Sequence, residues 1–461
     1  MTSLVAVFAL VVSGLPLAWA LTRAVPLATL LAPLAGAAVA TVGVLLSLWL
    51  GGPLLPWFGA AFLGSIAVAW SVRRAAPLPG GSWREAGWLG VPLLPLFLLV
   101  FKDPLGWDAH AIWWLHAGYF AHGGGFARAA IGNEALVLNH TDYPPLSSAP
   151  VAVAWQLLDS YTFRPALSVN VAVTFSAVVL VAYAVRRATA GLPRWLSIPV
   201  ALLAACGAWL PDFRAPTEGY SDTLCASAFV AGAVLLLGTS QGVQGAKSPL
   251  PGAGAKRLRN PLLPLSLFLV AAAILTKNEG LPLALILAVV ATVRFRSRAA
   301  AWCWLPLAAG VAWSSTARAF GARNDLMSGG RFGALLRGDA ERWGRLPPVQ
   351  DAMLGQVRFV VGAALVTALL GAVFLRGRRR ALGLGGDGWL WAVLGGYWVA
   401  ITLIYLISPY PIIWHLATSV DRVTIVLAML ATVSASIWLA VALAPKPSPA
   451  DQVSPDEACV A

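Results

Sequence analysis

The chain has 461 residues, of which 59% are hydrophobic and only 11% are charged. Soluble domains carry about 25% charged residues, so this composition excludes a soluble globular protein and predicts an all-α polytopic membrane protein. The formal net charge is +13, and in a membrane protein the positions of these charges decide what the number means.

Apolar segments near the length of a membrane span recur along the whole chain. No Lys or Arg precedes Arg23, so the basic region of a signal peptide is missing and we expect the first segment to be retained. The pattern predicts about thirteen spans. They are 2–22, 25–50, 56–72, 87–102, 162–185, 194–211, 221–239, 261–276, 281–293, 299–315, 351–374, 388–407 and 423–444.

The spans divide the chain into four parts. Residues 1–102 hold N-terminal transmembrane helices, and residues 103–161 form a long outer loop. A transmembrane core follows over 162–445, with a second outer loop at 316–350. The tail 446–461 is polar and rich in proline, so we expect it to be disordered and cytoplasmic.

Basic residues gather in every second connection between the spans. Alternating the thirteen spans places 19 basic and five acidic residues on one face, a balance of +14. By the positive-inside rule this face is cytoplasmic, so the net charge reflects orientation and no nucleic-acid partner is expected. The basic connections are 73–84, 186–194, 247–259, 294–298 and 376–380.

The first outer loop begins with an aromatic segment. Residues 107–120 have helical spacing and suit a short helix lying in the membrane interface. Asp108 stands at the start of this helix, where it is either a helix cap or a reactive carboxylate.

The same loop continues with "NHTDYPPL" (139–146). Tyr143 precedes a double proline and must be extended, and the prolines can start a second short helix at 146–158. His140 and Asp142 flank the turn, so they either satisfy it or belong to a site.

Three later motifs place charged residues at the outer ends of spans. In "TEGYSD" (217–222), Asp222 opens a span and either caps it or acts in a site. "TKNEG" (276–280) reads as a turn at the outer rim, because glycine follows and the flanking spans are short. Lys277 and Glu279 then form either a solvated pair or part of a site.

The last motif is "WHLATSVDR" (414–422). Arg422 either pairs with the neighbouring Asp421 or binds a phosphate, and His415 lies in the same segment. The second outer loop, 316–350, holds six arginines and is either a lid or a solvated loop near anionic headgroups.

The order and common sidedness of these motifs resemble the GT-C superfamily of polytopic glycosyltransferases. Within it the chain is most similar to the dolichyl-phosphate-mannose–protein mannosyltransferase-like enzymes and their bacterial relatives, over about residues 100–425. "DYPPL" resembles the family's acid–Lys–Pro–Pro–Leu and Tyr–Pro–Pro–Leu forms, and "TKNEG" its Thr–Lys–x–Glu–Gly turn. Tyr143 stands where some members have Lys, and the three or four spans before residue 103 exceed the family's usual single helix.

The resemblance implies an inverting glycosyltransferase of the bacterial cytoplasmic membrane. It would move a sugar from a polyprenyl-phosphate donor to a glycan, lipid or protein acceptor on the extracytoplasmic face. The catalytic candidates are Asp108, as general base, and Asp222. The candidates for binding the donor's phosphate and sugar are Lys277, Glu279, Arg422, His415, Asp142, Tyr143 and His140.

Two other functions stay open at this point. A transporter or flippase for a lipid-linked substrate would also carry charges within broken helices, and a lipid-linked glycan ligase would share the sidedness. No residues have metal-ligand spacing. A divalent cation bound by His110 together with His140 or Asp142 stays open as an alternative.

Overall fold

The computed structural model describes residues 1–78, 82–99, 106–238, 261–296, 298–323, 330–382 and 387–445. These residues form helices and no strands, as the composition predicted. The predicted tail 446–461 and the predicted inner loop 247–259 lie outside the described residues.

Among the described residues, seven helices are long and apolar enough to cross a membrane. In the same part of the chain, five further apolar helices have only 10–17 residues, which is shorter than a typical membrane crossing. The chain is therefore an integral membrane protein by composition and helix length, and the count of thirteen spans stays a prediction. The seven are Thr2–Thr22, Val25–Leu50, Leu54–Ser71, Phe163–Ala188, Ala340–Phe374, Gly388–Ile407 and Ile412–Leu443.

The N-terminal helices are α1 (Thr2–Thr22), α2 (Val25–Leu50) and α3 (Leu54–Ser71). Small residues let α1 and α2 touch along their backbones. A Cβ atom on Gly14 would lie 1.9 Å from a backbone oxygen of α2, and one on Gly36 would lie 2.2 Å from a backbone oxygen of α1. Such close contacts between small residues are how helices associate in lipid, where no hydrophobic force draws them together.

The span expected at 87–102 is broken. The structure has two short helices here, α4 (Trp83–Gly90) and α5 (Leu94–Leu99), separated by a turn at 91–93. Pro92 lies in that turn and has no N–H with which to continue a helix. The prediction treated the segment as one apolar run and missed this break.

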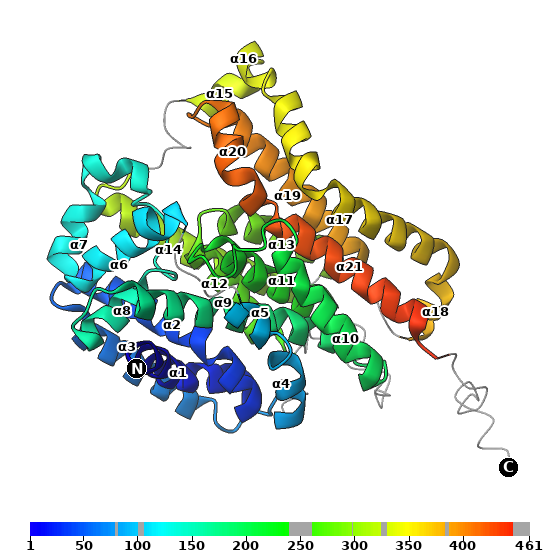
Figure 1. Cartoon of the computed structure of the whole chain (residues 1–461), viewed down its shortest axis with the longest axis horizontal. Helices are drawn as coiled ribbons and strands as arrows, with labels where there is room; N and C mark the ends of the chain where they lie inside the picture. The colour runs from blue at the N-terminus through cyan, green and yellow to red at the C-terminus, as the bar shows by residue number, and fades with distance from the viewer. Residues whose placement is uncertain are drawn as a thin grey trace.

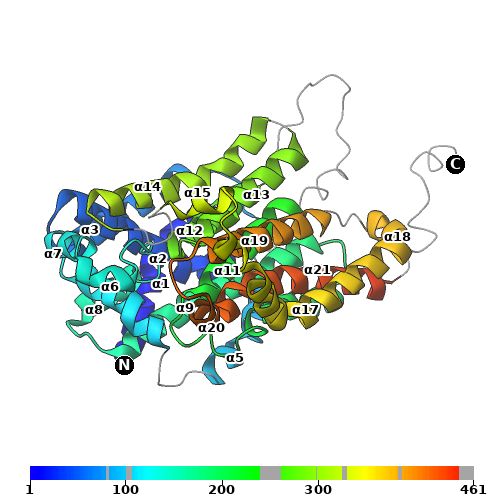
Figure 2. The same cartoon turned by 90° about the horizontal axis from the view of Figure 1, so that it is seen from above.

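A core of four helices follows the outer loop: α9 (Phe163–Ala188), α10 (Arg194–Ala205), α11 (Asp222–Gly238) and α12 (Leu263–Thr276). α11 packs against α9, α12 and the C-terminal helix α21 (Ile425–Leu443), and its residues are buried along almost their whole length. Figures 1 and 2 both show α1 to α3 on one side of this core and α17 and α18 on the other. The central helix thus begins with a carboxylate, that of Asp222.

The remaining helices complete the outer loops and the C-terminal half. The outer loop holds the π-helical Ala109–Trp114, α6 (Leu115–Ala121), α7 (Gly124–Ile131), the 3-10 helix Glu134–Asn139 and α8 (Ala149–Leu158). The others are the 3-10 helices Cys206–Trp209 and Arg298–Trp304, α13 (Gly280–Phe295), α14 (Leu305–Ala319), α15 (Arg331–Leu336), α16 (Ala340–Trp343), α17 (Leu346–Phe374), α18 (Arg376–Ala381), α19 (Asp387–Ile407) and α20 (Ile412–Val423).

Residues expected on the cytoplasmic face contact one another. Arg186 Nε lies 3.4 Å from Glu85 Oε1, which joins α9 to α4. Arg378 donates a hydrogen bond of 3.3 Å to the carbonyl of Ala442, which joins α18 to the end of α21. Both contacts link residues that the basic connections assign to the same side.

Residues expected on the outer face contact one another in the same way. Trp49 Nε1 donates to Thr316 Oγ1 at 3.1 Å, and Arg345 donates to the carbonyl of Ser408 at 2.8 Å. In Figure 1 the helices α6 and α7 lie at the left, α15 lies at the top, and α18 lies at the right. Each of these contacts joins residues that the sequence assigns to the same face, and the assignment of the two faces stays a prediction.

Candidate functional site

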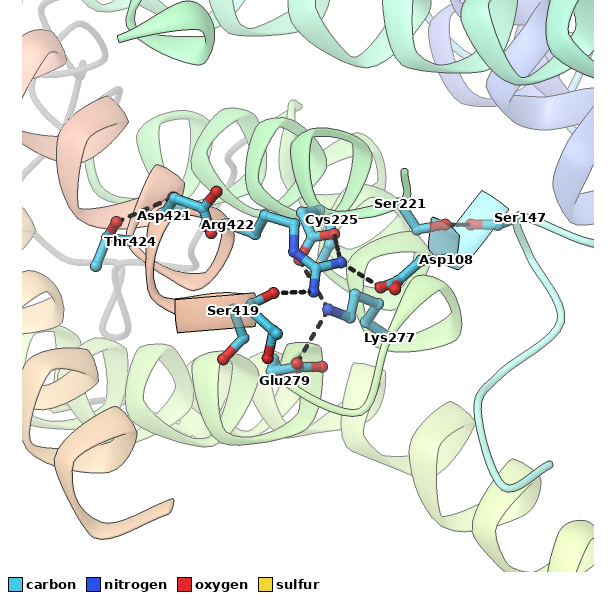
Figure 3. Close-up of polar contacts among 12 residues, drawn as sticks. Asp108, Ser147, Ser221, Cys225, Lys277, Glu279, Ser419, Asp421, Arg422 and Thr424 are labelled. Atoms are coloured by element: carbon cyan, nitrogen blue, oxygen red, sulfur yellow. Dashed lines mark hydrogen bonds and ion pairs between the residues drawn. The ribbon is translucent and has the colours of Figure 1, made fainter. Parts of the chain in front are cut away.

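Five charged side chains from four distant segments meet at the first turn of α11, and Figure 3 labels Asp108, Lys277, Glu279 and Arg422 among them. Lys277 Nζ lies 2.7 Å from Asp222 Oδ1 and 3.1 Å from Glu279 Oε1. Arg422 Nη1 donates to Asp108 Oδ2 and lies 3.9 Å from Asp222 Oδ2. We call Asp108, Asp222, Lys277, Glu279 and Arg422 the charge cluster.

The turn between α12 and α13 places Lys277 in the charge cluster. Lys277 has extended backbone angles and ends α12, and α13 begins at Gly280. A Cβ atom on Gly280 would lie 2.4 Å from the carbonyl oxygen of Ala273, so only glycine lets α13 fold back this closely. The segment is a turn, as predicted.

The two charged residues of this turn are not a solvated pair. Only 8% of the Lys277 side chain and 20% of the Glu279 side chain are exposed. Burial alone would lower the pKa of Lys277, but the carboxylates of Asp222 and Glu279 hold that pKa well above its ordinary value. Lys277 is therefore a charged residue within a buried network.

Asp108 does not cap its helix. Its carboxylate accepts no capping hydrogen bond, and its own backbone already has helical angles. The carboxylate instead accepts a hydrogen bond from Arg422. Between the two interpretations of Asp108, the structure excludes a simple cap.

Arg422 likewise turns away from its sequence neighbour. The carboxylate of Asp421 accepts a hydrogen bond of 2.9 Å from the backbone N–H of Arg422, not from the guanidinium. The guanidinium donates to the carbonyl of Thr418 and lies 4.8 Å from the centre of the Tyr220 ring. It is thus held by a carboxylate, a carbonyl and an aromatic face.

Two glycines allow the aspartate loops to approach. Gly219 has φ +81°, a conformation that favours glycine, and a Cβ atom there would lie 3.0 Å from the Cβ of Ala109. A Cβ atom on Gly106 would lie 2.1 Å from the Tyr220 ring. The start of the outer-loop helix therefore packs directly on the loop that leads to Asp222.

Hydrogen bonds fix the outer loop to the core beside the charge cluster. Ser221 donates to Ser147 at 2.7 Å, and Asn170 of α9 donates to the Ser147 carbonyl at 3.1 Å. Leu146 N–H donates to the carbonyl of Leu275 at 2.9 Å, in the last turn of α12. The "PPL" segment is therefore attached to the helix that ends in the cluster.

The charge cluster holds three carboxylates and two cations, so its formal charge is negative by one. Asp222 Oδ2 and Glu279 Oε2 are buried and accept no hydrogen bond among the described residues. A carboxylate oxygen can only accept hydrogen bonds, and leaving one unpaired in a buried site is costly. Both oxygens would be satisfied by a ligand that brings hydroxyl groups.

Asp142 and Tyr143 lie at the edge of the charge cluster. Asp142 accepts hydrogen bonds of 2.7 Å from Asn278 through its side chain and from Trp313 through its carbonyl, so it fixes the turn. The ring of Tyr143 stacks on Trp113 and lies 5.8 Å from Lys277 Nζ. Tyr143 thus presents an aromatic face to the cluster.

His140 and His415 have contacts with residues outside the charge cluster. The His140 ring stacks on Tyr143 with centroids 4.7 Å apart. His415 Nδ1 lies 2.8 Å from Ser408 Oγ, at the corner between α19 and α20. His140 therefore packs against Tyr143, and His415 contacts the residue that follows α19.

No group of three or more His, Cys, Asp or Glu side chains among the described residues could hold a metal ion. The His110 ring packs against Trp114 and Phe163, with centroids 4.9 and 4.8 Å away. Within the charge cluster, Asp222 Oδ1 and Glu279 Oε1 flank the ammonium group of Lys277 at 2.7 and 3.1 Å.

The sequence reasoning missed Tyr220, Asn278 and Trp313. Tyr220 and Asn278 lie inside "TEGYSD" and "TKNEG", so their position beside charged candidates was the available signal. Trp313 has no local signal, because its hydrogen bond reaches Asp142 from 171 positions away.

No family model, curated protein or solved structure matches this chain. The chemistry of the site is therefore read from its own geometry. The charge cluster offers a carboxylate that can take a proton, two cations that can pair with a phosphate, and acceptor oxygens for hydroxyl groups.

Proposed function

We propose that the chain is a membrane glycosyltransferase that moves a sugar from a polyprenyl-phosphate donor to an acceptor at the outer face. One observation carries the proposal. Asp108, Asp222, Lys277 and Arg422, chosen from separate motifs, meet in a single buried cluster. An inverting transfer from a lipid phosphate needs a base and cations in one place, because both partners react at one carbon.

Arg422 and Lys277 are the partners that we assign to the donor's phosphate. The guanidinium matches two phosphate oxygens at once, and the ammonium supplies a point charge. Arg422 is now paired with Asp108, so a bound phosphate would take over that guanidinium and release the Asp108 carboxylate. Donor binding would in this way prepare the base.

Asp108 is the proposed general base. The acceptor hydroxyl gives its proton to the Asp108 carboxylate while its oxygen bonds to the anomeric carbon. The bond from that carbon to the phosphate oxygen breaks, and its electron pair stays on the phosphate. The cations stabilise the charge that the phosphate gains, and the proton on Asp108 removes one negative charge from the cluster.

The sugar would lie against the unpaired oxygens of Asp222 and Glu279. Sugar hydroxyls are donors, and these two buried oxygens are acceptors without a hydrogen-bond partner among the described residues. The ring faces of Tyr143 and Tyr220, which lie within 5.8 Å of the two cations, add apolar contact surface.

The predicted orientation supports an extracytoplasmic site in the bacterial cytoplasmic membrane. The charge cluster lies at the helix ends opposite those near the basic connections. A polyprenyl donor keeps its chain in lipid and its phosphate at the rim, where the cluster is expected.

The test is a transfer assay with the purified full-length chain in lipid nanodiscs. A panel of polyprenyl-phosphate sugars is supplied with envelope extract from a strain that lacks the gene, and mass spectrometry detects free polyprenyl phosphate and the glycosylated acceptor. We expect one donor class to be consumed by the wild type. Consumption of none, together with transport of a lipid-linked sugar across proteoliposomes, would overturn the proposal in favour of a flippase.

A further inference from the structure

A second candidate binding site lies at the other face of the molecule. A groove of about 490 Å³ opens between α4 and α10, which contact each other. This volume is in the range of small-molecule sites, about 300–1,000 Å³. The residues that line this groove include Arg84, Trp88, Arg194, Trp195, Ile198 and Leu202.

The groove carries uncompensated positive charge. Arg84 and Arg194 lie in the first turns of α4 and α10, and neither side chain forms an ion pair or hydrogen bond with a described residue. Glu85, which also lines the groove, is occupied by Arg186 at 3.4 Å. Two arginines therefore converge on one space with no acid to balance them.

Apolar side chains of the same two helices also line the groove. Trp88 and Trp195 are 53% and 65% exposed, and Ile198 and Leu202 follow along α10. Exposed tryptophans are typical of the lipid–water interface. A ligand that fits this groove has an anionic head and an apolar body.

We propose that this groove binds the headgroup of an anionic phospholipid of the inner leaflet. Arg84 and Arg194 belong to the basic connections that the positive-inside rule assigns to the cytoplasm, and basic pockets between helices on that side recognise such headgroups. A polyprenyl phosphate is the other source of a lipid phosphate, but the proposed donor site lies at the opposite face. The proposal does not depend on the glycosyltransferase activity.

The experiment measures the association of spin-labelled phosphatidylglycerol with the full-length protein in phosphatidylcholine nanodiscs. Arg84→Gln and Arg194→Gln should each weaken association about fivefold, and the pair about 30-fold. Each arginine near the membrane surface is expected to strengthen the association by about a factor of five. The matched control, Arg73→Gln with Arg74→Gln, removes two charges from the same face outside the groove. This control should leave association close to the wild-type level.

Three results would overturn the proposal. They are equal losses in the groove pair and the control pair, no loss in either, or displacement of phosphatidylglycerol by equimolar polyprenyl phosphate. Arg84→Lys with Arg194→Lys keeps the charge and should retain most of the binding. Thermal unfolding in pure phosphatidylcholine checks that each variant is folded. If the double Gln variant does not fold, the two single Gln variants are compared with the wild type instead.

Discussion

Asp108 and Arg422 are 314 positions apart in the chain, yet the Arg422 guanidinium donates a hydrogen bond to the Asp108 carboxylate. Both side chains are largely buried, with 16% and 13% of their surfaces exposed. The contact joins the first outer-loop helix to α20 and keeps the proposed base paired. A phosphate that takes Arg422 would therefore change the state of Asp108, which links donor binding to catalysis.

The first prediction concerns the base. Asp108→Asn keeps the shape of the side chain and an oxygen for Arg422, but it cannot take a proton. Turnover should fall by about 10²–10⁴, the usual contribution of general base catalysis, while donor binding remains. The assay is sugar transfer at saturating donor.

The control for this change is Asp212→Asn. The Asp212 carboxylate accepts a hydrogen bond from the backbone N–H of Arg214 at an exposed turn, and asparagine can keep it. Its turnover should match the wild type. Near-normal turnover in Asp108→Asn would remove Asp108 from the mechanism.

The second prediction separates structural from functional roles of the buried ion pairs. Lys277→Ala leaves Asp222 and Glu279 buried without their cation, and this should destabilise the protein by about 3–5 kcal/mol. Neutralising all three groups, with Lys277→Met, Asp222→Asn and Glu279→Gln, should restore most of the thermal stability because no unpaired charge remains.

The triple variant should nevertheless be inactive, because the cation for the phosphate is gone. Apparent unfolding temperature and sugar transfer are measured on the same preparations. Recovery of both in the triple variant would mean that these residues only stabilise the fold.

The third prediction concerns pH. His116 is fully buried, and this burial lowers its pKa from 6.5 to about 4, although its hydrogen bond to the Asn139 carbonyl opposes the shift. Between pH 6.5 and 4, His116 is therefore protonated in the unfolded chain but neutral in the folded chain. Stability from this group is complete above pH 6.5 and decreases as the pH falls toward 4, by about 3 kcal/mol in all.

His116→Gln should flatten the stability profile between pH 6.5 and 4. The comparison is His122→Gln, an exposed histidine just after the same helix, which should leave the profile unchanged. Thermal unfolding across this pH range measures both. An unchanged profile in His116→Gln would show that acid sensitivity arises from other groups.

The sequence predicted the helical architecture well, because hydrophobic length and composition dictate it. The first three helices begin and end within about two residues of their predicted bounds, and "KNEG" is a turn. The break at Pro92 was missed, since the run 87–102 is apolar on both sides of it. A local hydrophobic pattern shows that a segment lies in an apolar environment, but it does not show whether the helix is interrupted within that segment.

The candidate site was only partly predictable for a different reason. The motifs supplied Asp108, Asp222, Lys277, Glu279 and Arg422, because charged residues at span ends are costly and therefore informative. Their partners could not be predicted, since these depend on which helices pack together.

Two of the four candidates outside the charge cluster illustrate this limit. His415 shares a motif with Arg422 but is bonded to Ser408, and Asp142 fixes a turn through Asn278 and Trp313. Residue type and position along the chain gave no means of distinguishing them from the members of the cluster.

The fourth prediction tests the orientation with two matched substitutions. Gly125 and Gly377 are exposed glycines around which an added Cβ atom meets nothing within 4 Å. In a background without the four native cysteines, Gly125→Cys should react with impermeant thiol reagents in intact cells and Gly377→Cys should not. Both should react in opened cells, and the reverse pattern in intact cells would place the charge cluster on the cytoplasmic side.

The most direct measurement of the central claim is a structure of the chain with a bound polyprenyl-phosphate sugar analogue. The account predicts that the phosphate lies within hydrogen-bond distance of Arg422, and of Lys277 directly or through one water. It also predicts that Asp108 no longer accepts a hydrogen bond from Arg422 and faces the anomeric carbon. A phosphate bound elsewhere, with the Asp108–Arg422 contact intact, would contradict the account.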